Sequence, residues 1–218
     1  MNNSTSHHTI DMIFAQTWLM VCQINQGISI TNGDGFYRRV CQLVDETRQK
    51  LLEHGYAESA VEHMQYAQCA LIDESIMNRQ TQDEGYNTWI QSPLQARYFN
   101  TLEAGDKLWD RLRSILNETA PNPDGLLCFH RVLTLGFVGK FRRKDAPERE
   151  QVMAQLNVQL PDYLISSELP LVVKPKLRFS RHRLYWLGWL SGILLLAGMW
   201  WGFSASLEQL LQQWMTQG

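Results

Sequence analysis

The chain has 218 residues, of which 44% are hydrophobic and 19% charged, so it can form a packed core and is not of the disordered class. Residues 1–173 carry 15 Lys and Arg against 21 Asp and Glu, a balance of −6, which gives no basis for binding nucleic acid. Residues 174–183 then carry five basic residues and no acidic one.

Helical periodicity dominates the chain up to Val158 and alternating strand patterns are scarce, which predicts an all-α fold. We expect a helical domain over residues 1–160. Its first helix, residues 10–25, is apolar nearly all round and should be central in the core. The sequence TNGDG at 31–35 predicts a turn. Further helices are expected over residues 36–53, 58–80, 92–102 (begun by Ser92 and Pro93), 107–118, 125–141 and 145–158.

A linker with a basic juxtamembrane part, residues 161–183, leads to twenty residues without a charge, Leu184 to Phe203. At about 1.5 Å per residue this segment matches the roughly 30 Å core of a bilayer. Trp and Tyr lie towards its two ends, where aromatic rings favour the interface. A buried core helix is the alternative, and the length, the aromatic residues and the flanking charges disfavour it. The sequence therefore predicts one transmembrane helix over 184–203.

The charges on the two flanks predict the direction of this helix. Five basic residues precede the span and only Glu208 is charged after it, so the N-terminal domain should be cytoplasmic. Residues 204–218 form a short tail on the other side, the topology of a tail-anchored protein. The apolar stretch 10–24 lacks a basic leader, so no secretory signal is expected. The four cysteines form no C-x-x-C pair, which favours reduced, buried thiols.

The predicted span has a stripe rich in small residues. Gly188, Ser191, Gly198 and Gly202 share one arc with Leu195, and Gly188/Gly192 and Gly198/Gly202 are G-x-x-x-G pairs. Small residues allow close approach of helices in lipid, so we expect a homodimer through this helix. The alternative is that glycine is simply common in spans.

Three segments resemble motifs of the TssL/DotU (IcmH) family of type VI and type IVB secretion systems. Cys69–Glu74 is similar to its A-L-x-D-E segment. Ser92–Gln95, Phe99 and Ala104–Trp109 are similar to its P-L-Q…F…A-G-E-x-F-[FW] stretch. Leu133–Arg142 is similar to its L-x-L-G-F-x-G-[RK]-[YF]-R signature.

The resemblance implies a structural component of a secretion apparatus in the bacterial inner membrane. Its cytoplasmic part would be two packed helical bundles that recruit the baseplate. Its membrane partner would be a large protein of the TssM/IcmF type. The tail 204–218 would then be periplasmic.

Asp73 and Glu74 are the acidic pair that one would test for catalysis. Adjacent helical residues point about 100° apart, so they are poorly placed to face one substrate. Glu74 could bind Asn78, and Asp73 could pair with a neighbouring helix or face solvent. With Leu71 at the centre of the inward stripe, Asp73 lies about 160° away. Asp73 is therefore the better candidate for an exposed group, although Cys69 and Ile76 share its side of the helix and leave open that a second helix covers part of that side. Both acidic residues are candidates for docking a partner.

No other motif indicates an enzyme, a cofactor or a metal site. Neither H-E-x-x-H nor C-x-x-C nor Gly-x-Ser-x-Gly occurs. Gly136 and Gly139, three apart on the helix predicted over 125–141, could line a close helix contact. The leading hypothesis is a secretion-system scaffold. A membrane-tethered adaptor of another complex is the alternative, and a tail-anchored enzyme is the third possibility.

Overall fold

The computed structural model describes residues 7–101, 104–141, 146–160 and 200. The chain divides into two units, Met1–Leu171 and Val172–Gly218. In the described part, the first unit contains helices and no strand, which confirms the predicted all-α class. The helices are α1 (His7–Ile13), α2 (Ala15–Asn25), α3 (Gly33–Glu53), α4 (Glu58–Met77), α5 (Glu84–Gln91), α6 (Leu94–Phe99), α7 (Ala104–Leu116), α8 (Pro123–Thr134) and α9 (Pro147–Gln159).

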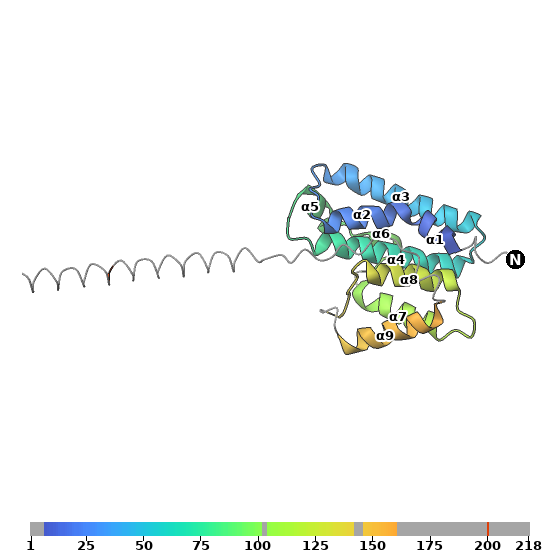
Figure 1. The fold of residues 1–218 in the computed structure, drawn as a ribbon. Coiled ribbons are helices and arrows are strands. Elements are labelled where there is room, and N and C mark those ends of the chain that lie inside the picture. Colours follow the sequence, from blue (N-terminus) through green and yellow to red (C-terminus); the bar gives the residue numbers. More distant parts are fainter. Residues whose placement is uncertain (1–6, 102–103, 142–145, 161–199, 201–218) are drawn as a thin grey trace, which may run out of the picture. The chain divides into compact units, whose positions relative to one another are not determined.

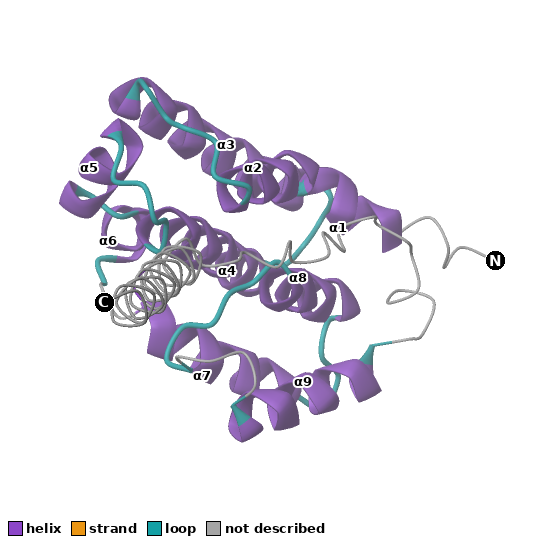
Figure 2. Ribbon diagram, turned by 60° about the vertical axis from the view of Figure 1, so that its left-hand side comes forward, coloured by secondary structure: helices purple, strands orange, loops and turns teal. Residues whose placement is uncertain are grey.

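Helix α4 is the centre of this unit. It packs against α2, α3, α5, α6, α7 and α8. Figures 1 and 2 show α4 beside α8, with α2 and α3 on one side and α7 and α9 on the other. Every residue from Met64 to Asp73 is buried, so this part of α4 has no solvent-facing side. The helix predicted over 10–25 is the pair α1 and α2, and its residues Ile13, Phe14, Trp18 and Val21 lie in the core as expected. It is not buried all round, because Met12 and Leu19 are 66% and 61% exposed.

Helix α3 begins at a helix cap within residues 31–35, where the sequence predicts a turn. The Asn32 side chain accepts a hydrogen bond from Gly35 N at 2.8 Å, which satisfies one of the free N–H groups of the first turn. The helix therefore begins at Gly33, inside the TNGDG sequence. The close approach of α5 also requires this glycine, since a Cβ there would lie 2.4 Å from Glu84 O.

Two buried tryptophans mark the two sides of α4. Trp89 of α5 contacts the rings of Phe36 and Tyr37 at centroid distances of 5.7 and 4.9 Å. Trp109 of α7 contacts Phe141 at 4.7 Å, and both tryptophans are fully buried. Burial of a large apolar side chain stabilises a fold by about 1.5–3 kcal/mol. The helix that carries Trp89 was not predicted from the sequence.

The predicted transmembrane helix, residues 184–203, lies outside the described part of the chain apart from Trp200. In the part that the structure describes, no helix has both the length and the apolar character needed to cross a bilayer. The small-residue stripe Gly188, Ser191, Gly192, Gly198 and Gly202 also lies outside the described residues.

Candidate functional site

Asp73 is buried at the junction of α4, α5 and α6, with only 4% of its surface exposed. Its Oδ1 atom accepts hydrogen bonds from Trp89 Nε1 at 2.7 Å and Leu94 N at 2.9 Å. Its Oδ2 atom accepts one from Gln95 N at 2.9 Å. The expectation that Asp73 is exposed is therefore wrong, because α5 and α6 cover the side of α4 on which it lies.

The Asp73 carboxylate caps the N-terminus of α6, which has no side-chain cap of its own. Leu94 and Gln95 are the first two residues of α6, whose own N-cap, Pro93, makes no side-chain cap hydrogen bond. The prediction from the sequence was a cap by Ser92. Asp73 supplies the acceptor from another helix, and a negative charge at a helix N-terminus is also favoured by the helix dipole.

The surroundings of Asp73 act on its pKa in two opposite directions. Burial raises the pKa of Asp73 to about 6, while the N–H donors of Gln95, Trp89 and Leu94 act in the opposite direction. The three N–H donors point at the two carboxyl oxygens, and donation to the charged form favours the carboxylate over the protonated acid. Hydrogen bonds to a charged acceptor are roughly twice as strong as neutral ones, which suits a structural clamp.

Glu74 holds a different segment, the loop that follows α8. Its Oε1 accepts from Val138 N at 2.7 Å and its Oε2 accepts from Gly139 N at 2.8 Å. Trp109 Nε1 donates to Val138 O at 3.1 Å, so α7 binds the same stretch from a second direction. The sequence predicts that Asp73 and Glu74 point apart, and their separate partners confirm this prediction.

The two glycines of this loop have backbone conformations that favour glycine. Gly136 has φ +118° and Gly139 has φ +59°, so α8 ends at Thr134 rather than continuing to Phe141 as predicted. Gly139 also touches Gly105 of α7: a Cβ on Gly139 would lie 2.6 Å from Gly105 O. A close glycine contact was expected, but it is made from a loop and not from a helix.

The segments that resemble family motifs therefore meet around one helix. Cys69–Glu74 lies on α4 and supplies the two carboxylates. Ser92–Gln95 binds Asp73, whereas Leu133–Phe141 binds Glu74, and the glycine of Ala104–Trp109 contacts that same loop. Sequence separation concealed this arrangement, since apart from Trp89 Nε1 the N–H groups that the carboxylates bind are backbone groups and leave no residue-type signal.

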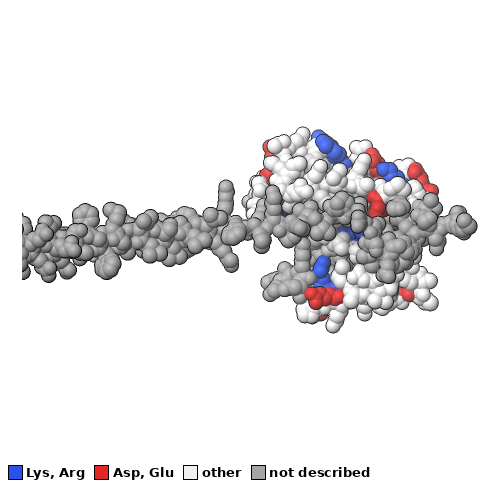
Figure 3. Space-filling view, in the orientation of Figure 1, with Lys and Arg blue, Asp and Glu red and all other residues white. Residues whose placement is uncertain are grey.

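The described side chains form no arrangement suited to catalysis or metal binding. No group of His, Cys, Asp and Glu in the described part could hold a metal ion. All four cysteines are free, as expected, although Cys22 is only half-buried. Burial raises the pKa of the Cys69 and Cys128 thiols, which keeps them protonated and poorly nucleophilic. Acidic and basic side chains are interspersed on the face shown in Figure 3.

Comparison with protein families and solved structures gives consistent matches. A family model described as type VI secretion system protein DotU matches residues 9–206. The structure is similar to that of SciP/TssL from enteroaggregative Escherichia coli 042, at 42% identity and TM-score 0.65, covering 71% of this chain and 89% of that chain. It is similar to the cytoplasmic domain of TssL from Acinetobacter baumannii, at 24% identity and TM-score 0.65, covering 71% and 98%. It is also similar to TssL from Vibrio cholerae, at 25% identity and TM-score 0.54, covering 71% and 95%. Comparison with curated proteins gave no match.

Proposed function

Because this chain belongs to the DotU family of type VI secretion proteins, we propose that it links a TssM/IcmF-like partner in the inner membrane to the cytoplasmic baseplate. Members of the family are non-enzymatic structural components of the secretion membrane complex. The family match covers residues 9–206, which include both the helical unit and the charge-free segment. The proposal adds the two connections, one at the membrane and one in the cytoplasm.

The proposed arrangement assigns one task to each part of the chain. Residues 1–160 dock the baseplate in the cytoplasm, residues 161–183 carry the chain to the membrane, residues 184–203 cross it and residues 204–218 are periplasmic. Five basic residues before the span and none after it support this direction. The small-residue stripe Gly188, Ser191, Gly192, Gly198 and Gly202 supports a homodimer through the span.

The observation that carries the docking proposal is the convergence of the motif segments on Asp73 and Glu74. A buried carboxylate such as Asp73 meets no partner directly, so its part in docking would be to hold the α5–α6 junction in place. Glu74 would hold the loop Leu135–Phe141, in which Lys140 is exposed. Pre-ordering of such a loop lowers the entropy that binding would otherwise cost. We therefore propose that the acidic pair positions the docking surface.

The test uses a strain that lacks this chain, complemented with wild-type protein, Glu74→Ala or the control Glu84→Ala. Glu84 is an exposed residue in the first turn of α5. Wild-type protein should restore secretion and co-purify from membranes with both a large inner-membrane partner and baseplate proteins. Glu74→Ala should keep the membrane partner and lose baseplate protein, and Glu84→Ala should behave as wild type. Normal baseplate recovery with Glu74→Ala would place the docking surface elsewhere. Secretion that is unaffected by loss of the chain would contradict the proposed function.

A further inference from the structure

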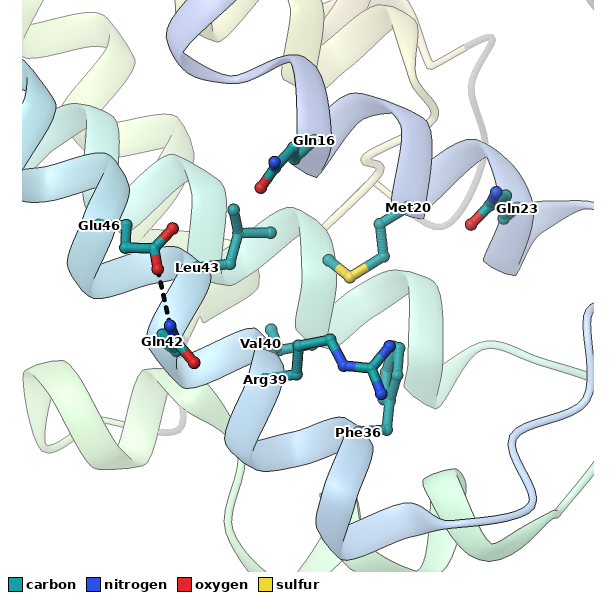
Figure 4. A pocket seen from close by; sticks show the side chains of 9 residues that line it. All are labelled: Gln16, Met20, Gln23, Phe36, Arg39, Val40, Gln42, Leu43 and Glu46. Carbon is teal, nitrogen blue, oxygen red and sulfur yellow. Dashed lines mark hydrogen bonds between the residues drawn. The ribbon is translucent and has the colours of Figure 1, made fainter.

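A pocket lies between α2 and α3, on residues that neither Asp73 nor Glu74 contacts. It has a volume of about 350 Å³. Figure 4 shows its apolar floor, formed by Met20 of α2 with Phe36, Val40 and Leu43 of α3. Only Val40 is fully buried, so the other three side chains leave apolar surface open to the pocket.

The edge of the pocket on α3 carries one charge of each sign. Arg39 and Glu46 both line it and are seven residues apart, which is two helical turns or about 10.5 Å along the axis. Glu46 accepts a hydrogen bond from Gln42 Nε2 at 2.8 Å. No hydrogen bond or ion pair of Arg39 occurs in the described part of the chain. An exposed guanidinium that has no partner among the described residues, beside an apolar floor, is suited to meet a carboxylate from another molecule.

The mixed charges and the size of the pocket limit what can occupy it. A lipid surface or a nucleic acid would call for basic residues alone at the edge. A volume of about 350 Å³ is near the lower end of the roughly 300–1,000 Å³ of small-molecule pockets. It suits a few anchoring side chains better than a whole cofactor. The two-turn spacing of Arg39 and Glu46 matches the spacing of residues seven apart on a second helix that lies along α3.

We propose that this pocket binds an amphipathic helix of another protein of the secretion apparatus, an inference that rests on the proposed function. Apolar side chains of that helix enter the floor between α2 and α3, as in other helix-in-groove contacts. Its acidic residue faces Arg39, and a basic residue seven positions away faces Glu46. The opposite charges select the register and the partner more than they add affinity.

The experiment places a photoactivatable amino acid at Leu43 of the full-length protein in membranes of secreting cells. Leu52 is the matched control, because it is a partly exposed leucine of the same helix and lies nine residues on, about 180° around the axis. Leu43 should crosslink to one helical segment that has an acidic and a basic residue seven apart with apolar residues between them. Leu52 should not crosslink to that segment.

Charge reversal then tests the contact itself. Arg39→Glu should lower the Leu43 crosslink at least fivefold without changing the amount of protein in the membrane. Reversal of the mapped acidic residue to Lys should restore the crosslink. The inference fails if Leu43 crosslinks to nothing, to lipid or to a second copy, if the segment lacks the charge pattern, or if reversal restores nothing. Each of these failures leaves the proposed function standing where the chain is still required for secretion and co-purifies with its membrane partner.

Discussion

Replacement of Asp73 by alanine tests whether a buried carboxylate holds α5 and α6 on α4. The change leaves the N–H donors of Trp89, Leu94 and Gln95 without their acceptor in a buried site. One unpaired buried donor costs about 1–3 kcal/mol, so three set an upper bound of about 9 kcal/mol. Removal of the charge also relieves the cost of burying it, and water entering the site restores part of the hydrogen bonding. We therefore expect a loss of about 3–5 kcal/mol, as for the breaking of other buried charged contacts.

The measurement is urea unfolding of residues 1–160, followed by far-UV circular dichroism. Asp73→Asn should lose less stability than Asp73→Ala, because one oxygen remains to accept from Trp89 and Leu94. It should still lose some stability, because its NH₂ group would face the Gln95 N–H. Asp110→Asn is the control, since Asp110 is 66% exposed and lies 3.7 Å from Lys140, and exposed ion pairs contribute about 0–1 kcal/mol. A loss below about 1 kcal/mol for Asp73→Ala would refute the structural role that we assign to this carboxylate.

The same site decides the outcome of Asp73→Lys. Exposure of Asp73, as expected from the sequence, would leave this variant folded and weaken only its binding to the baseplate. Burial among three N–H donors reverses the expectation, because an ammonium group has no acceptor there and shares their sign. We expect residues 1–160 with this change to show no cooperative unfolding transition. A folded variant with lowered secretion would support direct docking by Asp73.

Further predictions concern the backbone, pH and the membrane helix. Gly139→Ala should lower stability by more than Gly27→Ala, because both have positive φ but only at Gly139 would the Cβ clash, 2.6 Å from Gly105 O; urea midpoints of the two variants measure the difference. Burial, and after it the neighbouring Arg131 charge, lowers the pKa of His130 in the folded protein. The unfolded chain therefore binds a proton at His130 more readily than the folded chain does. The contribution of His130 to the free energy of unfolding should be complete above pH 6.5, the ordinary pKa, and should be lost as pH drops through the lowered pKa of the folded protein. The loss of stability over this pH range should be smaller in His130→Gln. Gly198→Ile combined with Gly202→Ile should weaken self-association of the full-length protein in a membrane two-hybrid assay, and unchanged association would assign these glycines to a contact with another span.

Long helices with marked periodicity could be predicted from the sequence. The helix expected over 58–80 is α4 (Glu58–Met77), and the one expected over 36–53 is α3 with three more residues at its start. Helix α5 was missed because it has only eight residues, one of them glycine, which is too short for an apolar face to repeat along it. Its local signal was Asp83, whose side chain accepts a hydrogen bond from Tyr86 N at 3.1 Å as the N-cap.

The error at Asp73 has a specific physical cause. The prediction assumed one apolar stripe on the helix with the opposite side facing solvent, a pattern that holds for surface helices. Helix α4 is central and is buried all round from Met64 to Asp73, so the side of it that carries Asp73 does not face water at that position. Cys69 and Ile76, which share the side of Asp73, are both fully buried and were the available sign that another helix covers it. The apolar residues on the side of Asp73 therefore indicated the central position of α4 better than the spacing of its one apolar stripe did.

The adjacency of the two carboxylates explains how one short motif can organise the two others. Because Asp73 and Glu74 point about 100° apart on a central helix, one reaches the α5–α6 junction and the other the loop after α8. A shift of either by one position would carry its side chain to a different neighbour and leave backbone N–H groups unpaired. The loop in turn needs Gly139, where it meets Gly105. The motif residues therefore depend on one another through backbone contacts, and that mutual dependence accounts for an acidic pair in a chain that does no acid–base chemistry.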